Sequence, residues 1–180
     1  MLKVAKEKYD GQNLPLTFRY GQFEKLPRSL HGKFDLVVCL ANAIAGVDTL
    51  ANLRASMKGF HAVLQPGGVL VLQMLNYSAI IENTPVPIKV TNNDGIVYAR
   101  YARRQGRRYT LHLVRLDLNA EPIGFEPFCT DFDNFTPDEV HKAIEKAGFK
   151  EIKRSGNLLL TSRFSRKSRD LVITARRAKA

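Results

Sequence analysis

The sequence predicts an α/β fold in which a parallel sheet carries an antiparallel β insertion. One observation is a strand–helix–strand unit: an apolar run over residues 34–40, an amphipathic stretch over 47–64 and a second apolar run over 69–75. The other is a change of periodicity. Between residues 86 and 132, apolar and polar residues alternate as they do in half-exposed strands.

The segment before the first apolar run predicts two short elements. Residues 1–9 place apolar side chains at helical spacings, as at the end of an amphipathic helix, and residues 14–18 predict a short strand. The continuous run over residues 34–40 is typical of a strand buried on both faces. Small residues follow it over 41–46, where the backbone can pass close to a ligand.

The next elements form the parallel unit. Apolar residues recur every three or four positions between Leu50 and Leu64, which predicts a helix, and Asp48 is its expected N-cap. The turn Pro66-Gly67-Gly68 is expected to end the helix, and residues 69–75 form the second buried strand. A helical crossover of this kind joins parallel strands, so we expect a right-handed βαβ unit.

The insertion and the C-terminal elements follow. We expect an antiparallel set, inserted into the parallel sheet or laid over it, with strands over residues 88–92, 96–103, 108–119 and 125–132. Thr136, Pro137 and Glu139 provide the cap, first-turn proline and early acid of a helix that ends at Gly148. Residues 149–154 and 171–175 are expected to close the sheet as a hairpin.

Composition excludes several classes of protein. The 180 residues are 44% apolar and 25% charged, which suits one globular domain, and no apolar run approaches the ~20 residues of a membrane span. Cys39 and Cys129 are too few for a disulfide scaffold, so the cytoplasm is the expected compartment. The four histidines are scattered without metal-ligand spacing, and we expect no metal site.

The formal net charge of +11 lies largely in two clusters, over residues 100–108 and 163–179. Excess positive charge attracts polyanions without specifying a fold. Two interpretations stay open: a solvated hairpin edge with a basic tail, or a surface for nucleic acid or an anionic substrate.

In this order the segments resemble the class I S-adenosylmethionine-dependent methyltransferase family, whose fold is Rossmann-like. The resemblance extends over residues 1 to about 176. Residues 1–6 resemble the helix after the family's second strand, residues 18–27 its third strand and loop, and residues 34–38 its fourth strand. Residues 60–72 resemble the helix, Pro-Gly-Gly turn and fifth strand, and the segment from Thr136 to Phe149 resembles the last helix and sixth strand.

The sequence departs from the family at its N-terminal side, because it contains no Gly-x-Gly motif. In the family, a glycine-rich turn lets the backbone approach the cofactor closely. We therefore expect a sheet that is incomplete at its N-terminal side, by two strand–helix units or on the order of 60 residues. We also expect the 180 residues to be inactive alone, and the exposed sheet edge to need a missing N-terminal segment or a dimer.

The resemblance implies one methyltransferase-like domain over residues 1–180, in which residues 86–132 form a lid that selects the acceptor. It places cofactor-binding residues after the third and fourth strands: Gly21, Gln22, Phe23, Leu40 and Ala41. Gln22 would accept a hydrogen bond from the adenine amino group, and Phe23 would stack on the ring.

Ligands bind at the carboxyl ends of parallel strands, which points to Asn42 after the first strand and to Asn76 and Tyr77 after the second. The resemblance implies catalytic roles for two of them. Asn42 would orient an acceptor amine or hydroxyl, and Tyr77 would line the acceptor pocket or accept a proton. In the insertion, an anionic acceptor would meet Arg100, Tyr101 and Arg103.

The expected function is methyl transfer from S-adenosylmethionine to nitrogen or oxygen of a small molecule. One alternative is a degenerate, non-catalytic methyltransferase-like module that binds a partner. The other is a nucleic-acid methyltransferase that uses the basic clusters. No membrane partner is expected.

Overall fold

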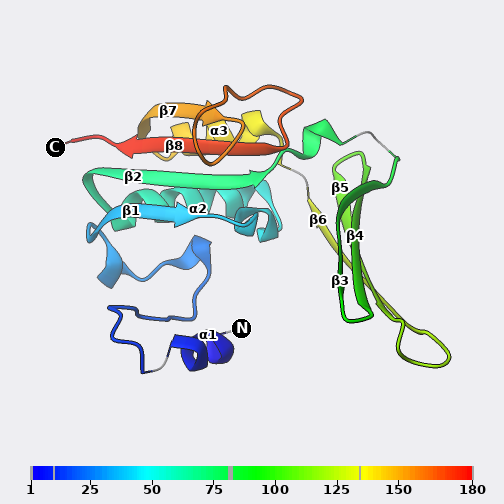
Figure 1. Cartoon of the computed structure of the whole chain (residues 1–180). Coiled ribbons are helices and arrows are strands. Elements are labelled where there is room, and N and C mark those ends of the chain that lie inside the picture. The colour runs from blue at the N-terminus through cyan, green and yellow to red at the C-terminus, as the bar shows by residue number, and fades with distance from the viewer. Residues whose placement is uncertain (1, 10, 81–82, 134, 180) are drawn as a thin grey trace.

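A computed structural model describes residues 2–9, 11–80, 83–133 and 135–179. It contains two four-stranded sheets set side by side (Figure 1). The first has the order β1-β2-β8-β7 and the second the order β3-β4-β5-β6. The mixed α/β architecture predicted from the sequence is confirmed. The strands of the first sheet are β1 (Phe34–Cys39), β2 (Leu64–Leu75), β7 (Phe149–Ser155) and β8 (Asp170–Arg177).

Helices α2 (Leu50–Val63) and α3 (Pro137–Lys146) pack together on one face of the first sheet (Figure 1). Strands β1 and β2 are parallel and joined through α2, as predicted. The N-cap of α2 is Thr49 rather than Asp48, because the Thr49 hydroxyl accepts from Asn52 N at 3.1 Å. The helix ends at Val63 and β2 begins at once, so the Pro-Gly-Gly segment lies within the strand.

Two predictions at the N-terminal side are wrong. Residues 14–18 form no strand, because no described strand lies beside them and Leu14 and Leu16 make only local backbone hydrogen bonds. Strand β1 is not buried on both faces. It pairs only with β2 among the described strands, and the side chains of Leu36 and Val38 are half exposed. Helix α1 (Leu2–Tyr9) forms as predicted.

The insertion forms a complete antiparallel sheet of its own. Its strands are β3 (Val86–Asn93), β4 (Ile96–Gln105), β5 (Arg108–Asp117) and β6 (Gly124–Asp133). The turn between β3 and β4 has Asp94 and Gly95 with positive φ, the geometry that a tight hairpin of right-handed twist requires. Ala102, Tyr109 and Leu111 bring one face of this sheet into contact with the main hydrophobic core.

The C-terminal elements follow the prediction closely. Thr136 and Glu139 form a capping box at the start of α3, where each side chain bonds the other's backbone N–H. Strand β8 lies between β2 and β7 and is antiparallel to both. The core of the main sheet combines Leu53, Met57 and Phe60 of α2 with the inward side chains of these strands. None of the described helices is long and apolar enough to cross a membrane.

Candidate functional site

A cleft of about 260 Å³ lies between the 3-10 turn η1 (Phe23–Lys25) and the 3-10 turn η3 (Ala43–Gly46) that follows β1. It brings three predicted cofactor residues together, and its lining is Gly21, Gln22, Phe23, Glu24, Ala43, Gly46, Val47 and Asp48. The Glu24 and Asp48 carboxylates accept hydrogen bonds from hydroxyls or amines. Sequence reasoning gave Glu24 no role and treated Asp48 as a helix cap.

Helix α2 holds η1 in place. The Phe23 ring meets Phe60 edge to face, with 5.4 Å between ring centroids. Gly59 lets the turn come this close, because a Cβ at that position would lie 2.8 Å from the backbone oxygen of Phe23. The close helix–turn contact thus depends on a glycine at this position in α2.

Leu40 and Ala41 lead from β1 into η3 without lining the cleft themselves. Ala41 and Asn42 have φ of 54° and 64°, two consecutive left-handed residues that turn the chain sharply after the strand. A non-glycine residue rarely adopts this conformation without support from its neighbours. The turn places Ala43 at the cleft and the Asn42 side chain toward β2.

Asn42 ties the carboxyl ends of β1 and β2 together. Its Oδ1 accepts from Leu75 N at 3.0 Å, and its Nδ2 donates a short hydrogen bond to the Tyr77 hydroxyl. Its own backbone N–H donates to Gln73 Oε1 at 3.3 Å, and Gln73 Nε2 donates to Asp170 Oδ1 at 2.7 Å. The two predicted catalytic residues therefore lie in direct contact.

Tyr77 lies in the 3-10 turn η4 (Tyr77–Ala79) and is 1% exposed. Burial raises the pKa of its phenol to about 12, against an opposing effect of the Asn42 hydrogen bond. Its ring packs against Tyr109 of β5, with 4.1 Å between centroids. Burial also raises the pKa of Tyr109 above its usual range. Tyr77 thus links the β2 end to the insertion sheet and is a poor proton acceptor near neutral pH.

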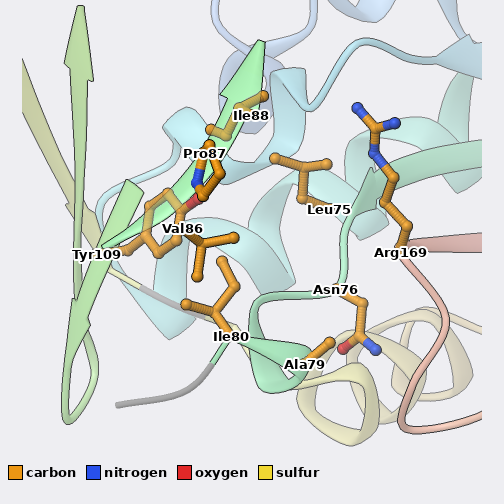
Figure 2. Close-up of a pocket in the computed structure, with 9 residues that line it drawn as sticks. All are labelled: Leu75, Asn76, Ala79, Ile80, Val86, Pro87, Ile88, Tyr109 and Arg169. Atoms are coloured by element: carbon orange, nitrogen blue, oxygen red, sulfur yellow. The ribbon is translucent and has the colours of Figure 1, made fainter. Parts of the chain in front are cut away.

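A cavity of about 310 Å³ lies where the carboxyl end of β2 meets the insertion sheet (Figure 2). Its wall is mostly apolar and comes from three parts of the chain: the β2 end with η4, strands β3 and β5, and the residue before β8. The lining residues are Leu75, Asn76, Ala79, Ile80, Val86, Pro87, Ile88, Tyr109 and Arg169. Tyr109 lines this cavity and also packs against Tyr77, which is the hydrogen-bond partner of Asn42.

The structure does not bring Arg100, Tyr101 and Arg103 together. Successive side chains point to opposite faces of a strand, and β4 pairs with β5 without interruption. Arg100 therefore shares a face with the core residue Ala102. Tyr101 and Arg103 lie on the other face, where Tyr101 stacks on His112 at 4.4 Å. None of the three lines the cavity.

Several basic residues bond within the protein. Arg177 Nη1 donates to the carbonyls of His61 at 2.9 Å and Leu64 at 2.5 Å, at the C-terminal end of α2. In the insertion, Arg115 bonds Asp117 and Glu126, and Arg107 bonds Glu139. No described cluster of three or more His, Cys, Asp or Glu side chains has the arrangement of a metal site.

Comparison with known proteins adds sequence and fold evidence. Residues 1–72 match the family model for a methyltransferase domain. The glycine/sarcosine N-methyltransferase of Halorhodospira halochloris is 33% identical over 58 residues, which is 32% of this chain and 22% of that protein. A counterpart from Aphanothece halophytica is 27% identical over 82 residues, or 46% of this chain and 31% of that protein. The matched part thus spans about a fifth to a third of these relatives.

The similarity to solved structures extends over almost the whole chain. An amino pentose methyltransferase of calicheamicin biosynthesis from Micromonospora echinaspora, solved with S-adenosylmethionine bound, has a TM-score of 0.76 and 26% identity. That match covers 98% of this chain and 70% of the solved one. A methyltransferase from Clostridium acetobutylicum shares the fold, with a TM-score of 0.77 and 13% identity. By sequence, residues 1–72 match a methyltransferase domain, and by fold almost the whole chain is similar to solved S-adenosylmethionine-dependent methyltransferases.

Proposed function

We propose that this chain forms the acceptor side and the adenosine side of a methyltransferase that acts on nitrogen or oxygen of a small molecule. One observation carries the proposal. The cleft at residues 21–24 and 43–48 and the cavity at Asn76 lie at the carboxyl ends of two adjacent parallel strands, and Asn42 connects those ends. Ligands of open α/β sheets bind in this position.

The cleft suits the adenosine part of the cofactor by its donors and acceptors. The Gln22 amide offers an acceptor for an exocyclic amine, Phe23 offers an apolar ring edge, and the carboxylates of Glu24 and Asp48 accept from hydroxyls. Bound S-adenosylmethionine supplies a methyl group on a sulfonium, which is an excellent leaving group. The chain's own residues then have to align the acceptor and exclude water.

Nitrogen is the favoured acceptor atom. The curated relatives are named glycine/sarcosine N-methyltransferases, and a further structural neighbour is a sugar N-methyltransferase. An amine can attack a methyl sulfonium without a strong base, because its lone pair is available once it is neutral. This suits a site in which the Tyr77 phenol, with a pKa of about 12, is protonated at neutral pH.

The two alternatives predict different behaviour. A nucleic-acid methyltransferase needs exposed cations that are available to phosphates, whereas Arg107, Arg115 and Arg177 bond carboxylates or carbonyls of this chain. Phosphate contacts would make RNA or DNA binding fall steeply with salt, and we expect only weak binding of this kind. A non-catalytic module would keep the fold without binding cofactor.

Calorimetric titration of S-adenosylhomocysteine, into the 180-residue chain and into a version extended upstream in its gene, tests the proposal. We expect the extended protein to bind, and the Gln22→Ala variant of it to bind about tenfold more weakly through loss of one hydrogen bond and one packing contact. An Arg163→Ala variant, outside the cleft, serves as the control. If neither protein binds, the chain is a non-catalytic member of its family.

A further inference from the structure

The loop between β7 and β8 presents three consecutive leucines to solvent. Leu158, Leu159 and Leu160, here called the apolar tip, are 52%, 82% and 54% exposed. Leucines scattered singly over a surface are common, whereas large apolar side chains gathered at one exposed place mark a site of interaction. The apolar tip is therefore a candidate contact surface.

The apolar tip lies on an ordered turn. Leu160 N donates to the Asn157 carbonyl at 3.2 Å, and Thr161 N donates to Asn157 Oδ1 at 3.2 Å. The Ser162 carbonyl closes the base of the turn by accepting from Gly156 N at 2.9 Å. Because these bonds fix the backbone on both sides of the leucines, the turn holds them away from the core.

Cations follow the apolar tip in the same loop. Residues 155–169 contain Arg163, Arg166, Lys167 and Arg169 and no Asp or Glu. All four side chains are exposed, and none of them forms an ion pair or a side-chain hydrogen bond with a described residue. An exposed Lys or Arg near an anionic bilayer is attracted to its surface. The loop thus combines an apolar tip with unpaired positive charge.

A hollow of about 450 Å³ lies beside the tip, and its lining includes Leu160, Lys153 and Arg163. Lys153 is exposed and, like Arg163, has no ion pair with a described residue, whereas Arg154 in the same lining bonds Asp138 at 2.8 Å. Other lining residues carry hydroxyls: Thr161, Ser162 and Thr174. Cations and hydroxyls of this kind donate to the oxygens of a phosphate.

We propose that this loop docks the protein on an anionic phospholipid bilayer. The leucines of the tip enter the interfacial layer, where their apolar surface leaves water. Lys153 and Arg163 bind a lipid phosphate at the hollow, and Arg166 and Lys167 lie against the neighbouring headgroups. A nucleic acid would satisfy the same cations but would leave the leucines in water, so the apolar tip favours the bilayer.

The sequence predicted no membrane partner, because no apolar run is long enough to span a bilayer. Docking on the surface needs no span. It depends on the exposure of residues 158–160, which is a property of the folded turn and not of the sequence pattern.

The loop is attached to the wall of the cavity in Figure 2. Asn76 Nδ2 donates to the carbonyls of Arg166 at 3.0 Å and Ser168 at 2.9 Å, and Asn76 also lines that cavity. In Figure 1 the loop lies at the same end of the main sheet as the carboxyl end of β2. A docked chain would hold the cavity close to the bilayer, which favours an amphiphilic acceptor. This consequence rests on the proposed function, whereas the docking itself does not.

Vesicle flotation tests the docking on the 180-residue chain and on the version extended upstream. The vesicles contain phosphatidylcholine alone or equimolar phosphatidylcholine and phosphatidylglycerol, and flotation separates bound protein from protein that has only self-associated. We expect both proteins to bind the mixed vesicles, more weakly as salt rises, and to leave the neutral ones unbound. Leu159→Ser should weaken binding about tenfold and Lys167→Gln about fivefold.

Two matched variants control for lost apolar surface and lost charge. Leu118→Ser replaces a 48% exposed leucine between β5 and β6, and Arg103→Gln removes an exposed charge from β4. Both should bind the mixed vesicles as the unmodified chain does. All four substitutions are at exposed residues, and unchanged circular-dichroism melting confirms that the variants are folded.

The outcomes decide the proposal whether or not S-adenosylhomocysteine binds. Loss of vesicle binding in Leu159→Ser and Lys167→Gln, but not in the controls, supports the docking. No binding to mixed vesicles, equal binding to both kinds, or equal effects of Leu159→Ser and Leu118→Ser overturns it. Release by soluble glycerol 3-phosphate would assign the attraction to free phosphate, and binding by the 180-residue chain alone would show that upstream residues cover the loop. Either result also overturns the docking.

Discussion

At the scale of single residues, Asn42 joins the turn after β1 to the end of β2. Asn42→Ala removes the acceptor of the Leu75 N–H and the donor to Tyr77, and it places alanine at a φ of 64°. We expect the free energy of unfolding to fall by about 2–3 kcal/mol, because a partly buried N–H loses its partner and alanine is strained in the left-handed region.

Urea denaturation measures this loss, and Asn42→Asp is the matched variant. Aspartate retains an acceptor for the Leu75 N–H and tolerates the left-handed conformation, so it should cost less than alanine. A loss below about 0.5 kcal/mol for Asn42→Ala would contradict a structural link between the two strand ends.

The buried phenol of Tyr77 gives the stability a dependence on alkaline pH. In the unfolded chain its pKa is near the ordinary tyrosine value of 10, and in the folded protein it is near 12. Between these pH values the unfolded state binds fewer protons, so the free energy of unfolding falls as the pH rises. The contribution of Tyr77 is complete below pH 10 and decreases above it, by at most about 1.4 kcal/mol per pH unit.

Urea denaturation at pH 9, 10 and 11 checks this expectation. Tyr77→Phe should show a shallower decline than the unmodified chain, while Tyr20→Phe, at an 89% exposed residue, should change nothing. Parallel declines in all three proteins would show that Tyr77 ionises as freely in the folded state as in the unfolded one.

The sequence located Asn42, Asn76 and Tyr77 through a rule about strand ends, and the structure places all three there. It did not predict that Asn42 bonds Tyr77, that Asn76 keeps a free acceptor, or that Arg169 lies beside the cavity. The first depends on a contact between residues 35 positions apart, and the other two depend on where β8 and its preceding loop pack, 90 or more residues from Asn76. Side-chain periodicity within one element contains no information on such distant partners.

At the scale of elements, the contact between η1 and α2 depends on Gly59. Alanine there would favour the helix by about 1 kcal/mol on intrinsic propensity. Its Cβ would, however, lie 2.8 Å from the backbone oxygen of Phe23. We expect Gly59→Ala to destabilise the protein by about 1–2 kcal/mol net, because η1 must move away from the helix.

Thermal denaturation of Gly59→Ala compared with Lys58→Ala provides the measurement. Lys58 is an exposed neighbour on the same helix, so its replacement should alter stability by less than about 0.5 kcal/mol. A gain in stability for Gly59→Ala would mean that propensity outweighs the contact and that the cleft at Phe23 is held differently.

Most elements were predictable from local signals. The capping box at Thr136, the hairpin turns of the insertion and the alternation along β4 and β5 each arise from neighbouring residues. The predicted strand at 14–18 failed because a strand also requires a partner for its backbone groups, and none of the described strands provides one. The prediction that β1 is buried on both faces was wrong for the same reason, since the burial of a strand depends on what packs against it.

At the scale of the whole molecule, some of the basic residues bond within the protein and others are exposed to solvent. Arg177 bonds the carbonyls at the end of α2, and Arg115 bonds two carboxylates in the insertion, so these charges are part of the fold. Arg100, Arg103 and Arg163 are exposed. Net charge alone therefore overstates the surface available to a polyanion, which is consistent with a small-molecule acceptor.

The unpaired edge of β1 predicts how the molecule behaves in solution. Its exposed residues Phe34, Leu36 and Val38 are 40%, 51% and 50% accessible, and among the described strands β1 pairs only with β2. An exposed apolar edge strand with free backbone groups is a template for another strand. We expect the 180-residue chain to self-associate as its concentration rises, with sedimentation velocity showing species larger than a monomer.

Val38→Lys should shift the chain toward monomer, because a charge on the exposed face of an edge strand opposes pairing and is costly to bury. Leu159→Lys adds the same charge at an 82% exposed leucine outside the sheets and should leave association unchanged. Equal effects of the two lysines would assign the change to net charge, and a monomer at all concentrations would show that the edge is protected. Association that only Val38→Lys abolishes identifies β1 as the surface where another strand docks, and β1 leads directly into the η3 turn that lines the cleft.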